Sequence, residues 1–323
     1  MNNKEVATKV VERILDMVKT EGKLPWTKPW GTKAGVEVAD GYTEITWTPR
    51  FWSRHGRPYD GINLLILGMT GLEGEWITFK QCQSEGGRVK KGAKATTVVF
   101  WSMVKKEETD PDTGEKKVRT IPLLKTYNVF HISQCEGLEQ KHNPKPRTIR
   151  IARTKWRPLS DCAADTIPAA ENVIAGYITR ESHLKLVRDQ YSDRACYYPD
   201  LDKVDVPMIQ QFDNAAEFYS TLFHELGHST GHETRLNRDI RNFFGSDKYS
   251  REELVAEITA ASILNILGIE SGNSFRNSAA YVQDWSEHIK NDPMMFVTAA
   301  ARADKAVNLI LGIEAETGLE DAA

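Results

Sequence analysis

Hydrophobic residues near the start of the chain recur with the period of an amphipathic helix. Val6, Val10, Ile14 and Val18 lie four residues apart among charged residues, and Gly22 follows them. Residues at this spacing share one face of a helix, and glycine is a common residue just beyond a helix end. The pattern therefore predicts an amphipathic helix that stops at Gly22.

The pattern then changes to the short alternating runs typical of β-strands. These runs are rich in β-branched and aromatic residues and are separated by Gly, Pro or charged turns. They cover residues 42–47 (YTEITW), 75–79 (EWITF), 94–101 (KATTVVFW) and 126–132 (TYNVFHI). The polar stretch 105–117 between the last two is typical of an exposed hairpin tip. With the leading helix, these strands predict an α+β domain.

Helical patterns dominate the last part of the chain. Asp213 is a suitable N-cap and Gly231 a suitable stop for a helix between them, and residues 195–209 before it resemble a hairpin. Residues 250–268 are apolar nearly all round, which predicts a buried helix. Asp292 followed by proline opens a final helix that ends near Gly312. We expect a mainly helical domain here.

Charge divides the chain in the same way. Residues 1–150 carry 25 Lys and Arg against 18 Asp and Glu, whereas residues 151–323 carry 17 against 27. Residues 141–157 contain seven basic residues and no acidic one, with prolines at intervals. We predict an α+β fold of two domains, 1–140 and 168–323, joined by a basic linker over 141–167. This linker is either a solvated connection or a basic strap that adds phosphate contacts.

Several classes of protein are excluded by composition. No stretch approaches the roughly 18 uncharged apolar residues of a membrane span, and the first twenty residues lack the apolar core of a secretory signal. The four cysteines are far apart and form no CxxC pair, which argues against a thiolate zinc site or a disulfide framework. We therefore expect a cytoplasmic protein with no membrane partner.

The stretch 221–232, TLFHELGHSTGH, contains the candidate metal-binding residues. His224 and His228 lie four residues apart, so a helix presents both imidazoles to one point, with Glu225 beside them. This is the HExxH pattern of a zinc site with two ligands and a general base. His232 lies about 12 Å further along the axis than His224, too far to share the same ion.

The third ligand is expected on the next helix. Glu253 and Glu257 are one turn apart on a helix whose continuation is apolar, and a buried carboxylate is costly unless it is paired or bound to a metal. We predict Glu253 as the third ligand and Glu257 as the acceptor for the free ring N–H of a histidine. The alternative is a capping box formed by Ser250 and Glu253, which leaves Glu257 unexplained.

Three protein ligands leave a fourth position for water, as in catalytic rather than structural zinc sites. The predicted cofactor is Zn²⁺, with Mn²⁺ or another divalent ion as the alternative. Glu225 would accept the proton of the activated water, and the hairpin before the helix would hold an extended peptide by strand addition. Arg235, Arg238 and the tyrosines are the candidates for stabilising an oxyanion.

The chain also resembles a known family, the ArdC-type antirestriction proteins of plasmids and other mobile elements. The resemblance covers nearly the whole chain. It is carried in the first half by LPWTKPW, GRPYDGINLLIL, EWITFKQCQSEGGRVKKGAK and YNVFHISQCEGL, and in the second by FYSTLFHELGHSTGHETRLNRD and YSREELVAEITAA. His131 departs from the asparagine that is usual at its position in the family.

The resemblance implies an N-terminal domain that binds single-stranded DNA and a C-terminal zincin-like metallopeptidase domain of the HExxH type. It also implies that the protein shields incoming DNA from host restriction. A host protein, such as a restriction protein or a DNA-bound protein, would be the substrate of the peptidase domain.

The residues of the first half support DNA binding separately. Six of the eight tryptophans lie within the first 101 residues, among Lys and Arg. Single-strand binders combine a basic groove with aromatic platforms on which bases stack, and neither part specifies a sequence. The alternative is a tryptophan-filled core beneath a solvated lysine face. The predicted DNA-binding residues are Trp26, Trp30, Arg88, Lys90, Lys91 and Lys94.

Two other functions are compatible with these motifs. The first is a single-stranded-DNA-binding protein whose metal is structural or regulatory. The second resembles the SprT-type repair proteases, which use DNA to find crosslinked protein. Their third ligand is a histidine, and the predicted second helix contains none.

Overall fold

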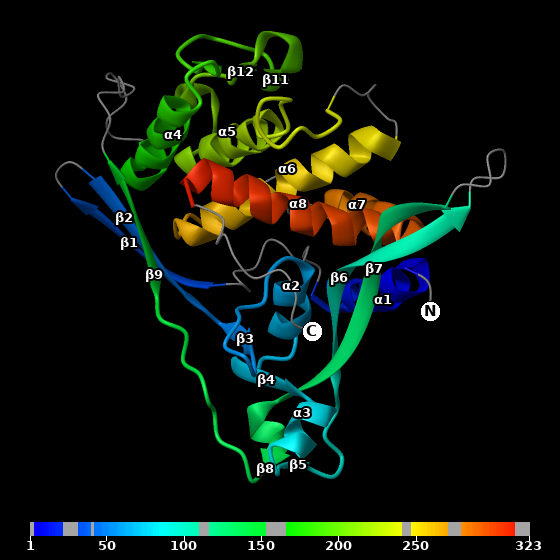
Figure 1. Ribbon diagram of the computed structural model, residues 1–323. Helices are drawn as coiled ribbons and strands as arrows, with labels where there is room; N and C mark the ends of the chain where they lie inside the picture. Colours follow the sequence, from blue (N-terminus) through cyan, green and yellow to red (C-terminus); the bar gives the residue numbers. More distant parts are fainter. Residues whose placement is uncertain are drawn as a thin grey trace.

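The architecture consists of a helical layer with two β arms that extend from it. The structure is a computed structural model that describes residues 3–21, 32–39, 42–109, 116–152, 166–240, 247–270 and 279–313. Helices α4 to α8 form the layer at the top of Figure 1. The arms run down from its two sides and approach each other at a tip that carries α3, β5 and β8 (Figure 1).

The predicted N-terminal helix is confirmed as α1 (Asn3–Glu21). Its apolar stripe is buried: Val6, Val10, Ile14 and Val18 are at most 5% exposed. The stripe shares one hydrophobic cluster with residues of α6, α7 and α8, including Phe296. The leading helix of the first half is therefore covered largely by helices of the second half, so the two halves share a core.

The left arm in Figure 1 is a three-stranded antiparallel sheet with the order β1-β2-β9. Its strands are β1 (Thr32–Ala39), β2 (Tyr42–Pro49) and β9 (Arg147–Ala152). Ile45 and Ile151 are buried in the cluster that contains α4 and α5. Part of the stretch predicted as a linker is thus a strand, because its alternating isoleucines cover the helical layer.

The right arm is a long hairpin of β6 (Thr96–Thr109) and β7 (Lys116–His131). It continues through β4 (Gly74–Thr78) to β3 (Phe51–Ser53), in the order β3-β4-β7-β6. Helix α2 (Ile62–Gly68) lies at the β6 edge. There the Asn63 side chain donates to the Val99 carbonyl at 2.8 Å and accepts from the Val99 N–H at 2.9 Å, as a neighbouring strand would.

The tip is held by a buried ion pair. Arg54 pairs with Glu75, which is fully buried, and with Glu85 at 2.7 Å. The second carboxylate oxygen of Glu75 accepts from the backbone of Lys141 and His142 at 3.1 and 2.8 Å. Around it lie α3 (Phe79–Ser84), β5 (Arg88–Val89), the 3-10 turn η2 (Ile132–Gln134) and β8 (Cys135–Glu136).

The second half begins with α4 (Pro168–Arg180) and a small sheet of order β10-β12-β11. This sheet contains β10 (Lys185–Val187), β11 (Cys196–Tyr198) and β12 (Lys203–Asp205), with the 3-10 turns η3 (Pro199–Leu201) and η4 (Ile209–Gln211) nearby. The predicted hairpin is confirmed, since β11 and β12 pair antiparallel.

Four helices complete the layer: α5 (Ala215–Ser229), α6 (Asp247–Ile266), α7 (Ala279–Asn291) and α8 (Pro293–Leu311). The final helix is capped as predicted, by the Asp292 side chain and by Gly312 at φ 72°. The predicted cap of α5 was wrong by one residue, because the Asn214 side chain accepts from Glu217 N–H. Among the helices of the described ranges, none is long and apolar enough to cross a membrane.

Candidate metal centre and its surroundings

The two histidines of the motif project from the same face of α5. Leu222, Phe223 and Leu226 are fully buried and fix the helix in the core, which sets the direction of the remaining face. His224 and His228 then lie with their ring centroids 4.7 Å apart and their planes at 84°. Their Nε2 atoms are 3.1 Å apart, so both point toward one position.

Glu253 on α6 completes a group of three. Its Oε2 lies 3.3 Å from His224 Nε2, and its Oε1 lies 3.3 Å from His228 Nε2. Tetrahedral ligands at about 2.0–2.1 Å from a zinc ion are separated by about 3.4 Å. The three donors therefore have the chemistry and the spacing that a single divalent ion requires, and they form a metal-competent group within the described residues.

The capping alternative for Glu253 is wrong, because α6 begins at Asp247 and Ser250 lies inside it. Behind the histidines stand two further carboxylates of the same helix. Glu257 Oε1 is 3.1 Å from His224 Nδ1, the position predicted for it, and Glu252 Oε1 is 3.5 Å from His228 Nδ1. Carboxylates in this position orient ligand histidines and increase their basicity.

Glu252 was missed from the sequence. The signal was available, since each histidine of an HExxH pair needs an acceptor for its second ring nitrogen and α6 offers three glutamates. Glu252 also pairs with Arg238 at 2.6 Å. Arg238 in turn donates to Thr230 Oγ1 and to the Gly227 carbonyl, at 2.8 and 2.9 Å. These bonds connect α6 with the C-terminal end of α5.

The electrostatics of the group favour a positive charge between its members. Burial alone would lower the pKa of His228, but its hydrogen bonds to Glu252 and Glu253 outweigh burial and raise that pKa well above 6.5. Burial alone would raise the pKa of Glu253, but its contacts with His224 and His228 hold the pKa far below 4.5. A carboxylate kept ionised beside two imidazoles is suited to bind a cation.

Close packing of α5 on α6 makes these distances possible. A Cβ atom added at Gly227 would lie 3.1 Å from Ala256 Cα and 3.4 Å from its carbonyl oxygen. Gly227 stands between the two histidines in sequence, so this close contact between the helices lies beside the three donors. The small residues on both sides of this crossing hold the imidazoles within reach of Glu253.

Glu225 is buried on α5, next to His224. Its charge acts on Cys196 of β11, the thiol pKa of which is raised first by burial and then by Glu225. Helix α5 packs against β11, so the predicted base and Cys196 belong to neighbouring elements. Among the described residues, β11 pairs only with β12 and is therefore an edge strand of the small sheet.

Both arginines considered as oxyanion donors are committed to other partners. Arg235 has a side chain only 2% exposed and binds Asp202 at 2.7 Å, Glu181 at 3.0 Å and the Ser229 carbonyl. It joins the turn between β11 and β12 to the end of α5. With Arg238 bound to Glu252, both residues position the site and neither is available for an oxyanion.

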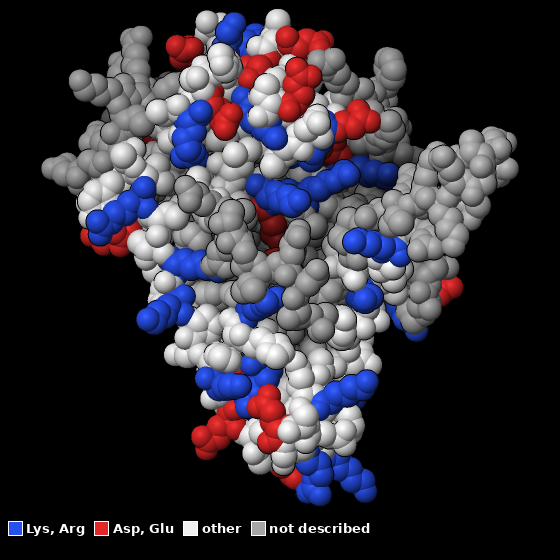
Figure 2. Space-filling model, viewed as in Figure 1, with Lys and Arg blue, Asp and Glu red and all other residues white. Residues whose placement is uncertain are grey.

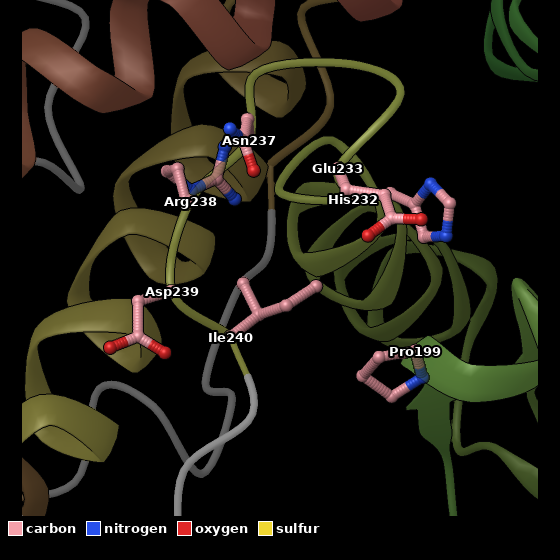
Figure 3. Close-up of a pocket in the computed structure, with 7 residues that line it drawn as sticks. All are labelled: Pro199, His232, Glu233, Asn237, Arg238, Asp239 and Ile240. Atoms are coloured by element: carbon pink, nitrogen blue, oxygen red, sulfur yellow. The ribbon is translucent and has the colours of Figure 1, made fainter.

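A pocket of about 330 Å³ lies between Pro199, the end of α5 and the segment that follows α5. His232 lines this pocket, whereas His224, His228 and Glu253 do not. Figure 3 shows Ile240 projecting toward the α5 side of this pocket and the Arg238 guanidinium turned toward α6. The lining residues are Pro199, His232, Glu233, Asn237, Arg238, Asp239 and Ile240.

The predicted DNA-binding residues divide into two groups. Trp26 and Trp30 lie outside the described residues. Arg88, Lys90, Lys91 and Lys94 are all exposed at the tip, around β5 and the turn before β6. Arg88 pairs with Glu136 at 2.7 Å, and Lys90 donates to the Ser133 carbonyl at 2.8 Å.

Charged side chains are unevenly distributed on one face of the molecule. In Figure 2, acidic side chains gather over the helical end near β11 and β12, whereas the middle of the same face carries mainly Lys and Arg.

Comparison with known proteins agrees with this division. Residues 175–302 match the family of zincin-like metallopeptidases, and residues 4–130 match the N-terminal domain of anti-restriction factor ArdC. DNA primase TraC from Escherichia coli is 32% identical over 319 residues, which cover 94% of this chain and 27% of the primase. The chain therefore spans about a quarter of the length of this relative.

Two solved structures resemble the whole chain. The metal-free antirestriction ArdC protein from the R388 plasmid is 31% identical, with a TM-score of 0.59, over 94% of this chain and 96% of that one. The Mn(II)-bound structure is 29% identical, with a TM-score of 0.61, over 97% and 99%.

The fold and these matches define the class first: an α+β protein that joins an ArdC-type N-terminal domain to a zincin-like metallopeptidase domain. At this level of identity and coverage, the chain belongs to the ArdC-type antirestriction proteins.

Proposed function

We propose that this chain binds single-stranded DNA through its first half and carries a divalent-metal hydrolase site of the peptidase type in its second. Together the two activities protect incoming DNA from restriction in the cytoplasm of the recipient cell. The convergence of His224, His228 and Glu253 at 3.1–3.3 Å carries the enzymatic part of this proposal.

His224, His228 and Glu253 would hold the ion, with Glu257 and Glu252 fixing the two rings from behind. Zn²⁺ fits the nitrogen and oxygen donors, and Mn²⁺ is the alternative because a related ArdC protein binds Mn(II). When bound, the ion activates water and polarises a carbonyl group.

Glu225 acts as the general base. It is held on α5 directly after the first histidine and is 8% exposed, so it accepts a proton in a largely desolvated site. It then delivers this proton to the leaving amine. Strand β11 packs beside α5, and as an edge strand it would orient an extended polypeptide across the site by backbone hydrogen bonds.

Single-strand binding is supported by the exposed cations at the tip. Arg88 lies on β5 and Lys90, Lys91 and Lys94 follow it; the turns on either side contain Gly86 and Gly92 with positive φ angles of 82° and 84°. Such a turn lets the backbone approach a phosphate chain closely while long side chains neutralise it. We expect weak sequence preference, because these contacts reach the backbone and not the base edges.

Replacement of Glu225 by Gln tests the enzymatic part. The E225Q variant should keep one metal ion per chain and an unchanged melting temperature, and it should lose cleavage of polypeptide in extracts of a restricting host. H228A serves as the matched control that also loses the metal. The functional readout is the transfer efficiency of unmodified DNA into a restricting host.

If E225Q protects DNA as well as wild type, proteolysis is not the protective mechanism, and the metal would serve a structural or regulatory purpose. The DNA part is tested by an Arg88/Lys90/Lys91→Ala variant in single-strand binding at several salt concentrations. Binding that is unchanged in affinity and salt dependence would exclude this patch.

A further inference from the structure

A second basic site lies away from the tip, in a groove between α1 and the β6–β7 hairpin. The groove has a volume of about 280 Å³. Its lining residues are Val6, Lys9, Val10, Arg13, Ile66, Thr97, Thr126 and Asn128. Figure 1 shows α1 lying against this hairpin, at the right of the molecule.

The residues of the walls indicate which kind of ligand the groove can bind. Lys9 and Arg13 are exposed and one turn apart on α1, so their charges stand on the same side of the groove. Thr97 and Asn128 are cross-strand partners, and Thr126 precedes Asn128 by two residues on β7, so all three side chains lie on the same face of the hairpin. The Thr97 hydroxyl donates to Asn128 Oδ1 at 2.9 Å, which directs the amide nitrogen of Asn128 away from Thr97.

The floor is apolar. Val6, Val10 and Ile66 are at most 5% exposed, and they belong to the core that α1 shares with the C-terminal helices. The two cations suit a phosphate, the neutral polar side chains suit the sugar and base attached to it, and the apolar floor suits their less polar faces. The same walls contain no acidic residue, so nothing among the lining residues repels an anion.

An exposed aromatic residue, Trp101, lies toward the end of the groove where α1 begins. The N–H of Leu124 donates to Asn3 Oδ1 at 2.9 Å, so the start of α1 lies beside Leu124. Trp101 is the cross-strand partner of Leu124 and lies on the same face as Thr97, four residues away. Its side chain is 40% exposed, which leaves ring surface for a base to stack on.

At its other end the groove is close to the tip. Thr97 follows Lys94 by three residues, a span of at most about 10 Å in an extended chain. We propose that the groove binds an internal backbone phosphate of single-stranded DNA through Lys9 and Arg13, with an adjacent base on Trp101. This inference rests on the proposed single-strand binding and extends it from the tip along α1.

The test uses the full chain and fluorescence anisotropy of a labelled oligothymidylate without a terminal phosphate. K9E/R13E reverses both charges, and K9Q/R13Q removes them. K4E/K19E is the matched control, because it makes the same charge change on α1 at exposed positions outside the groove lining. Melting temperatures identify any variant that is misfolded.

We expect K9Q/R13Q to reduce the slope of log affinity against log salt by about 0.7, the value for the loss of one phosphate contact on a single strand. K9E/R13E should bind more weakly still, and K4E/K19E should keep the wild-type slope. W101A should weaken binding at least about fivefold, with its salt slope unchanged.

Equal slopes for wild type and K9Q/R13Q would overturn the inference. So would an effect confined to strands with a terminal phosphate or to mononucleotides, or equally strong competition by poly-glutamate. If wild type binds no single strand, the proposed function fails first. If wild type binds and only the Arg88/Lys90/Lys91→Ala variant weakens binding, the groove alone is excluded.

Discussion

The carboxylate of Asp304 on α8 connects the two halves, and its ionisation makes the stability of the fold depend on pH. It accepts a hydrogen bond from the Gly61 N–H, just before α2, and it faces Asp60. Its pKa is raised to about 7, first by burial and then by the charge of Asp60, and the Gly61 hydrogen bond offsets part of this rise. Replacement by Asn removes the charge and keeps an oxygen that can accept from Gly61.

The raised pKa determines the direction in which stability changes with pH. An aspartate with an ordinary pKa of 3.8 in the unfolded chain and about 7 in the fold favours folding fully below about pH 3.8. This contribution is lost as the pH rises to about 7. At about 1.4 kcal/mol per pH unit, the interval corresponds to at most about 4 kcal/mol. Asp60 is exposed and Asp304 is partly exposed, so solvent screening reduces the expected effect to about 1–2 kcal/mol.

Urea unfolding of wild type and D304N at pH 4.5 and pH 8 measures this effect. At pH 8 the variant should be more stable by about 1–2 kcal/mol, and at pH 4.5 the difference should be small. D189N, at an exposed loop position, is the matched control and should change stability at neither pH. A D304N variant that is less stable at pH 8, or equally stabilised at both pH values, would refute the raised pKa of Asp304.

Three further outcomes follow from the packing of the tip and the metal centre. R54A leaves the fully buried Glu75 without its cation and should destabilise the fold by about 3–5 kcal/mol in urea unfolding, whereas an unchanged midpoint would contradict the pairing. G227A places a Cβ 3.1 Å from an α6 Cα atom, so the variant should have lower metal affinity despite the higher helix propensity of Ala, as calorimetric titration would show. E252Q removes the charge behind His228 and should weaken metal binding about 10–100-fold in the same titration. An unchanged metal affinity would show that Glu252 only binds Arg238 and does not support the histidine.

Much of the metal centre was predictable because it depends on local periodicity. The spacing of His224 and His228 fixes their common face once a helix forms, and two glutamates one turn apart in an otherwise apolar helix imply a buried polar partner. The strands of the right arm were predictable for the same reason, since their alternation is visible in the sequence. These features need only the geometry of a single element.

Other features depend on how distant elements meet. The burial of α1 under α7 and α8 is a tertiary outcome, and the sequence shows only that one face of α1 must be covered. The β9 strand was hidden in a basic, proline-containing stretch, where charged residues alternate with Ile149 and Ile151. The exact cap of α5 also escaped prediction, because Asp213 and Asn214 are both good N-caps and only the path of the chain selects between them.

Glu252 shows why neighbours in sequence can acquire separate tasks. Adjacent residues of a helix point about 100° apart, so Glu252 and Glu253 reach different nitrogen atoms of the His228 ring. The close crossing at Gly227 brings α6 near enough for Glu253 to face both Nε2 atoms, while Glu252 reaches the far side of His228 and the Arg238 guanidinium. The two histidines are placed by α5 alone, but their distance from Glu253 depends on the crossing of α5 and α6. A substitution at that crossing should loosen the metal centre without altering any of its ligands.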